Sequence, residues 1–184
     1  MTSSLSRRRF FQLAGLATLA FPLRGWAAID TSGGDEIVIL NDIHLTGIPE
    51  EKIPANAKDD DDHLRTAVKQ ILALAKKPAA VIINGDLALA IGTAADYAVV
   101  RELIAPLRDA GIPVHLTLGN HDVRDVFRQT FPEMPSASAL KDHRHNSVID
   151  LPSTRLILLD TLDQTPGPGG RLGAEQIAWM LAKI

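Results

Sequence analysis

The chain has 184 residues, of which 46% are hydrophobic and 22% are charged, and its formal net charge is −3. This length and composition suit one globular domain and exclude disordered and fibrous proteins. Cysteine is absent, which excludes disulfide frameworks, thiolate catalysis and Cys-ligated zinc. Any metal ion must therefore be bound by His, Asp, Asn or Glu.

Residues 1–27 have the features of an export signal. Three arginines at positions 7–9 precede an apolar stretch from Phe10 to Leu23, and small residues follow. The segment SRRRFF at 6–11 resembles the twin-arginine signal of proteins that are exported after folding. An uncleaved transmembrane anchor is the less favoured alternative, because about 14 apolar residues fall short of the roughly 20 that span a bilayer.

This signal leads to several expectations about where the protein acts. We expect the twin-arginine export machinery as a partner, a bacterial periplasmic or extracellular location, and no stable membrane association after cleavage. Removal of residues 1–27 takes away four of the 19 Lys+Arg and none of the 22 Asp+Glu, so the mature net charge is −7. The basic surface of a nucleic-acid-binding protein is missing, and we expect no nucleic acid partner.

Residues 28–184 form one expected domain, in which strands and helices alternate. Apolar runs predict strands at 36–41, 79–84 and 112–118. Helical spacing predicts a helix over 64–75 and another over 97–107, with Pro106 as a kink or an early stop. Such alternation is typical of βαβ units, so the fold class is α/β with a mostly parallel sheet.

The pattern changes in the last third of the chain. Two apolar runs separated by a turn predict a hairpin or two adjacent strands over 147–160, and residues 165–173 have the composition of a loop. A helix is expected over 174–184, with Ile177, Met180, Leu181 and Ile184 on one face and Trp179 in the core.

Polar residues follow each of the first three predicted strands. These groups are Asn41-Asp42-Ile43-His44, Asn84-Gly85-Asp86 and Gly119-Asn120-His121-Asp122. In an open α/β sheet, ligands bind beyond the carboxyl ends of the strands, so we expect the three groups to converge. Turn and cap chemistry would explain one such group, but three that converge favour a binding site.

The residue types in these groups suit metal binding. Asp42 and His44 are two positions apart, so they can point the same way and reach one ion. The carboxylate of Asp86 can bridge two ions, and Asn120 offers an amide oxygen to the second. Oxygen and nitrogen ligands suit Mn, Fe, Zn or Co. His121 would then face a substrate as a proton donor, with Asp122 fixing its orientation.

The motifs DIH at 42–44, GD at 85–86 and GNHD at 119–122 resemble the first three motif blocks of the calcineurin-like metallophosphoesterases. Three longer segments, at 85–107, 119–133 and 156–180, resemble the branch of class III cyclic-nucleotide phosphodiesterases and glycerophosphodiesterases. The resemblance covers nearly everything from Glu36 onward. It implies an α/β/β/α sandwich and a binuclear metal centre that clamps a phosphoryl group and activates a water molecule.

The resemblance also implies roles for individual residues. Asp42 and His44 would bind the first metal ion, Asp86 would bridge, and Asn120 would bind the second ion. His121 is the implied catalytic residue, assisting the leaving group or stabilising charge in the transition state. A contact between Arg124 and the substrate is a weaker hypothesis, based on its position in the same loop.

The chain departs from the family after its last predicted helix. Relatives continue with a strand that carries a histidine ligand and with a Gly-His-x-His block, whereas this chain has no histidine after His145. His143 and His145 precede the hairpin and are poorly placed as substitutes. We therefore expect an incomplete metallophosphoesterase domain, with the C-terminal strands and last metal-ligand motifs absent.

Two hypotheses about function remain at this point. In the first, the protein hydrolyses small phosphoester substrates, most of all phosphodiesters of the cyclic-nucleotide or glycerophosphodiester type. In the second, it is a non-catalytic remnant of such an enzyme, a weak metal binder or an interaction protein. The sequence leaves the substrate, the metals and the oligomeric state open.

Overall fold

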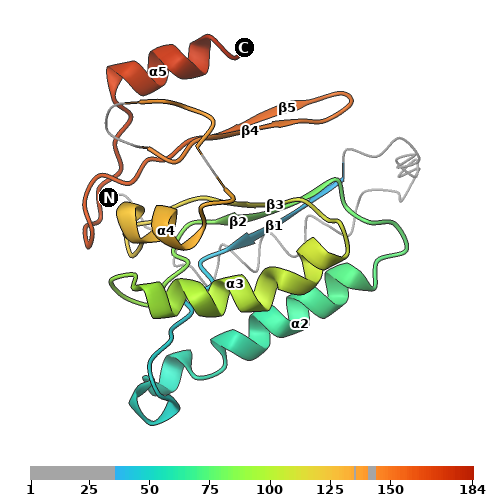
Figure 1. Cartoon of the computed structure of the whole chain (residues 1–184), viewed down its shortest axis with the longest axis vertical. Coiled ribbons are helices and arrows are strands. Elements are labelled where there is room, and N and C mark those ends of the chain that lie inside the picture. Colours follow the sequence, from blue (N-terminus) through green and yellow to red (C-terminus); the bar gives the residue numbers. More distant parts are fainter. Residues whose placement is uncertain (1–35, 135, 141–143) are drawn as a thin grey trace, which may run out of the picture. The chain divides into compact units, whose positions relative to one another are not determined.

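The computed structural model describes residues 36–134, 136–140 and 144–184, so the expected export signal lies outside the described residues. Figure 1 shows the arrangement of the elements. They follow in the order β1 (Ile37–Asn41), η2 (Glu50–Lys52), η3 (Ala55–Ala57), α2 (Asp60–Leu72), β2 (Ala80–Asn84), α3 (Ala94–Asp109), β3 (Val114–Leu116), α4 (Arg124–Thr130), β4 (Ser147–Asp150), β5 (Arg155–Leu158) and α5 (Ala174–Leu181).

The first three strands form a parallel sheet in the order β1-β2-β3, which confirms the expected topology. Asn41 is level with Asn84, and Ile83 is level with Leu116, so the three carboxyl ends lie at one edge of the sheet. The two crossover helices, α2 and α3, run along the same face of this sheet (Figure 1).

The main hydrophobic core lies between the sheet and the helices. The central strand β2 is buried at its first four positions, as expected for a strand covered on both faces. Val81 and Ile83 of β2 pack in the same cluster as Tyr97, Val100 and other buried side chains of α3.

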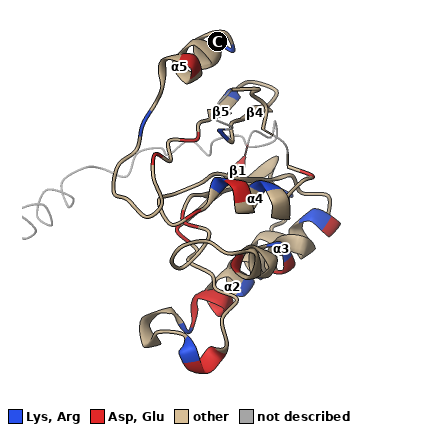
Figure 2. Ribbon diagram, turned by 60° about the vertical axis from the view of Figure 1, so that its left-hand side comes forward, with Lys and Arg blue, Asp and Glu red and all other residues tan. Residues whose placement is uncertain are grey.

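The other face of the sheet is covered by the antiparallel hairpin β4-β5. Ile149 of the hairpin packs with Ala80 and Ile82 of β2 in a second, smaller core. Helix α5 lies beyond the hairpin in both views (Figures 1 and 2). The sequence of layers is therefore helices, parallel sheet, hairpin and helix, in agreement with the expected α/β/β/α arrangement.

Several helix boundaries differ from the expectation. Helix α2 begins four residues before Leu64, because Asp60, Asp61 and Asp62 occupy its first turn, where the helix dipole favours negative charge. Helix α3 continues through Pro106 to Asp109, since a proline in the last turn removes only one hydrogen bond.

Two further differences concern the C-terminal half. The seven residues of α4 were not predicted, because so short a helix gives little periodicity. The expectation that Trp179 lies in the core was wrong, since α5 buries Gln176 and leaves Trp179 only half-buried. The apolar face of α5 remains exposed to solvent, with Ile177 40% and Leu181 61% exposed.

Over the described residues, the helices are too short or too polar to cross a membrane.

Candidate metal centre

The segments after β1 and β2 remain paired beyond the ends of the strands. The His44 amide donates to the Asp86 carbonyl at 3.0 Å, and the Leu45 amide donates to the Leu87 carbonyl at 2.9 Å. Leu45 is fully buried, and its own carbonyl accepts from the Leu89 amide at 2.8 Å. These bonds fix the two segments against each other where the predicted ligands lie.

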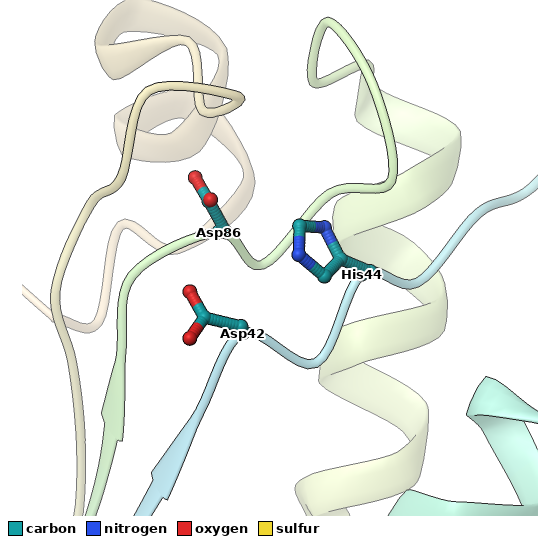
Figure 3. A group of neighbouring side chains, drawn as sticks. All are labelled: Asp42, His44 and Asp86. Atoms are coloured by element: carbon teal, nitrogen blue, oxygen red, sulfur yellow. The ribbon is translucent and has the colours of Figure 1, made fainter. Parts of the chain in front are cut away.

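Asp42, His44 and Asp86 come together in this region (Figure 3). Each offers one ligand atom, and the three atoms all lie within 4.8 Å of one another. Asp42 is exposed, while the other two residues are half-buried. The convergence predicted from the strand ends is therefore present for these three side chains.

The same three residues have unusual backbone conformations. Their φ angles are 51° at Asp42, 46° at His44 and 44° at Asp86, and no other non-glycine residue in the described part of the chain has a positive φ. The left-handed region costs a non-glycine residue on the order of 1–3 kcal/mol. Local backbone strain is thus concentrated at the residues that bring the potential ligands together.

The side chains of this cluster fit a divalent metal ion. The imidazole of His44 lies beside the carboxylates of Asp42 and Asp86, which is a donor set of the N/O type that transition metals prefer. The cluster thus offers both ligand atoms and negative charge at the carboxyl edge of the sheet.

The segment after β3 closes around Asp86. The His121 amide donates to Asp86 Oδ1 at 3.0 Å. A side chain at Gly119 would collide with the Asp86 carboxylate and with its backbone nitrogen, so the close approach requires glycine at this position. Asn120 is half-buried and stands in the chain between Gly119 and His121, the two residues that approach Asp86.

The His121 ring is held at the edge of the cluster. It lies 5.2 Å from the His44 ring, measured between centroids. Its Nδ1 atom is 2.8 Å from the Leu89 carbonyl oxygen. Because a carbonyl only accepts, this contact assigns the proton to Nδ1 and leaves Nε2 available for chemistry.

Asp122 does not orient His121, contrary to the expectation. Its fully buried carboxylate instead accepts four hydrogen bonds from other groups. The donors are Leu87 N at 3.2 Å, Ala88 N at 3.2 Å, Gly119 N at 2.8 Å and Tyr97 Oη at 3.2 Å. Burial raises the pKa of the Asp122 carboxyl, and these four donors act in the opposite direction.

Arg124 faces a different group. Its Nε donates to Asp160 Oδ2 at 2.7 Å, and its guanidinium also donates to Asp160 Oδ1 at 3.0 Å and to the Leu162 carbonyl at 2.8 Å. Asp160 is fully buried, so this bidentate pair connects α4 to the segment after β5. A substrate contact of Arg124 stays a prediction.

Sequence reasoning missed three groups that organise this region. The Leu89 carbonyl belongs to the backbone, so the residue type does not indicate its role. In the sequence, Tyr97 is recognisable only as an apolar position of a predicted helix. Asp160 follows the apolar run of β5 just as Asp42 follows that of β1, so the same rule of polar residues at strand ends would have found it.

Comparison with known proteins is consistent with this geometry. Residues 36–168 match the family described as calcineurin-like phosphoesterase. This range includes all the predicted site residues and most of the described chain.

Two curated relatives are similar over most of the chain. A "cAMP/cGMP dual specificity phosphodiesterase" of Mycobacterium tuberculosis is 30% identical over 148 residues, which are 79% of this chain and 43% of the relative. A "Probable cyclic nucleotide phosphodiesterase" of Rhodococcus erythropolis is 29% identical over 150 residues, which are 80% of this chain and 46% of the relative. The chain thus spans about half the length of these relatives.

Proposed function

Because the chain belongs to the calcineurin-like phosphoesterase family, we propose that it acts as a metal-dependent phosphodiesterase on substrates of the cyclic-nucleotide type. The observation that carries this proposal is the cluster of Asp42, His44 and Asp86 at the carboxyl edge of the parallel sheet. The names of the two curated relatives support the choice of phosphodiesters over phosphomonoesters.

The proposed centre holds two divalent metal ions. Asp42 and His44 would bind one ion, Asn120 the other, and Asp86 would bridge them, with Mn, Fe, Zn or Co as candidates. When bound, the ions supply positive charge for the phosphoryl oxygens and lower the pKa of a nearby water molecule. The protein contributes ligands whose backbone is fixed by pairing between the segments after β1 and β2.

His121 is the proposed proton donor. The Leu89 carbonyl accepts from Nδ1 and fixes the plane of the ring, so the protonated imidazole presents Nε2–H to the leaving oxygen. The amide of the same residue donates to Asp86 Oδ1, which couples the position of the proposed donor to that of the proposed bridging ligand. Proton transfer to the leaving oxygen offsets the charge that develops there as the ester bond breaks.

Hydrolysis of a chromogenic diester tests the function. The 184-residue chain, with Mn²⁺ added, is expected to hydrolyse bis(4-nitrophenyl) phosphate and cyclic AMP in preference to 4-nitrophenyl phosphate. Asp86→Ala should abolish turnover, because it removes the bridging carboxylate, while Asp125→Ala should not, because that carboxylate is 79% exposed on α4. His121→Ala should reduce turnover by about 10²-fold or more and leave Mn²⁺ content unchanged.

The results separate the two functional hypotheses. Equal turnover by wild type and Asp86→Ala would contradict the proposed centre. Stoichiometric Mn²⁺ binding without hydrolysis of any of the three substrates would instead support a non-catalytic metal-binding protein.

We also propose that residues 1–27 direct twin-arginine export. The support is the segment SRRRFF followed by an apolar stretch and small residues. Replacement of Arg7 and Arg8 by Lys should retain the protein in the cytoplasm of an expressing bacterium, as measured by fractionation. Periplasmic recovery equal to that of the wild type would argue against this route.

A further inference from the structure

The hydroxyl of Tyr97 lies at the centre of a buried network outside the ligand cluster. Tyr97 Oη donates to Asp122 Oδ1 at 3.2 Å and accepts from the Val123 amide at 2.7 Å. Tyr97 and Asp122 are both fully buried. The hydroxyl therefore uses its donor and an acceptor lone pair where water cannot replace them.

The Asp122 carboxylate connects two of the segments that carry predicted ligands. On one side it accepts from the Leu87 and Ala88 amides, which directly follow Asp86. On the other side it accepts from the Gly119 amide, which directly precedes Asn120. One carboxylate thus sets the distance between the segment after β2 and the segment after β3.

The first turn of α3 also contacts the segment after β1. Asp96, the neighbour of Tyr97, accepts from the Gly47 amide at 2.7 Å and from Thr46 Oγ1 at 3.1 Å. Gly92 packs against the Tyr97 hydroxyl so closely that a side chain there would collide with it. The Gly92 amide in turn donates to the His121 carbonyl at 2.9 Å.

We propose that Tyr97 is a positioning residue of the metal centre, whose hydroxyl holds Asp122 and thereby fixes Asp86 relative to Asn120 and His121. The aromatic ring fills the core against Phe127 and Phe131, but the hydroxyl has a separate role. Without it, the Asp122 carboxylate loses one of its four donors, the Val123 amide loses its acceptor, and the two segments can separate.

This inference rests on the proposed metal-dependent function. The experiment below distinguishes failure of the positioning role from failure of that function. The probe is Mn²⁺ alone, titrated calorimetrically into the 184-residue chain, with the free energy of unfolding measured in urea for each variant. Tyr97→Phe keeps the ring and removes the hydroxyl. The matched control is Ile104→Val, a fully buried position on the same helix that contributes to the core without touching the network.

Tyr97→Phe is expected to weaken Mn²⁺ binding about tenfold, the range seen when outer-shell partners of metal ligands are removed. Ile104→Val should lose stability and bind Mn²⁺ like the wild type. If Tyr97→Phe does not fold, Gly92→Ala, which displaces the hydroxyl, should show the same loss of affinity.

Equal Mn²⁺ affinity in wild type and Tyr97→Phe, or an equal loss in Tyr97→Phe and Ile104→Val, would overturn the positioning role and leave the proposed function intact. Absence of Mn²⁺ binding by the wild type would contradict the proposed metal centre itself, and the positioning role with it.

Discussion

At the scale of single residues, backbone strain coincides with the candidate metal cluster. Among the described non-glycine residues, positive φ angles occur at Asp42, His44 and Asp86. A strained backbone persists only where the surroundings determine it, and here pairing of the segments after β1 and β2 supplies that constraint. Relief of the strain should therefore improve the metal-free fold at the expense of the site.

Asp42→Gly provides a test of this relation. Glycine adopts a φ of 51° without steric cost, so the metal-free variant should be more stable than the wild type by about 1 kcal/mol. Its Mn²⁺ affinity should fall, because a ligand is lost. Urea unfolding in the presence of EDTA measures the first effect, and Asp42→Ala is the control that loses the ligand without relieving strain. A metal-free Asp42→Gly no more stable than Asp42→Ala would argue against stored strain.

Residue types and spacing were sufficient to predict that Asp42, His44 and Asp86 cluster. Asp42, His44 and Asp86 follow apolar runs whose parallel arrangement could be inferred from the alternation of strands and helices. The orientation of His121 could not be predicted, because it depends on a backbone carbonyl of a segment 32 residues away. Asp122 was misassigned for a similar reason, since its partners are mostly backbone amides.

At the scale of elements, the N-terminus of α3 contacts the segment after β1 that carries two of the potential ligands. Thr93 and Asp96 form a capping box, in which the Asp96 carboxylate accepts from the Thr93 amide at 2.8 Å and the Asp96 amide donates to Thr93 Oγ1 at 3.3 Å. The same carboxylate binds the segment after β1 through Gly47 and Thr46. Helix initiation and loop placement therefore depend on one side chain.

Asp96→Ala should destabilise the protein by about 2 kcal/mol, because it removes the cap and leaves the Gly47 amide without its acceptor. Glu102→Ala, an exposed position on the same helix, should change the free energy of unfolding by no more than about 0.5 kcal/mol. Urea denaturation of both variants provides the comparison. A loss in Asp96→Ala as small as that in Glu102→Ala would show that the cap is dispensable.

Element boundaries were predictable only in part. Strands β1 and β2 and the two strands of the hairpin all lie within the predicted ranges, because buried strands give continuous apolar runs. Strand β3 is limited to Val114–Leu116, which is shorter than predicted, although the Thr117 amide still donates to the Ile83 carbonyl of β2. Helix α4 escaped prediction because seven residues give little periodicity, although Phe127 packs in the main core.

At the scale of the whole molecule, a buried histidine couples stability to pH. His145 is 3% exposed, and its ring contacts Phe127. Burial lowers the pKa of His145 from the ordinary value. Nearby Arg128 and His115 also lower this pKa, whereas Asp160 raises it. The unfolded chain therefore binds a proton at a higher pH than the folded protein does. Stability is complete above the unfolded pKa of about 6.5 and falls as the pH decreases below it.

We expect the free energy of unfolding of the metal-free protein to decrease between pH 7 and pH 5, and His145→Gln to reduce this decrease. His115, whose pKa is also lowered by burial, accounts for part of the remainder. Urea midpoints measured with EDTA across this range provide the test. An unchanged pH dependence in His145→Gln would show that other groups control it.

The central claim is that Asp42, His44 and Asp86 bind a divalent metal ion at the carboxyl edge of the parallel sheet. The most direct measurement is anomalous diffraction from crystals of the chain grown with Mn²⁺, with data collected near the manganese absorption edge. We predict an anomalous peak within about 2.5 Å of a carboxylate oxygen of Asp42, a carboxylate oxygen of Asp86 and a ring nitrogen of His44. A map without a peak among these side chains, or with manganese bound only elsewhere on the molecule, would contradict the account.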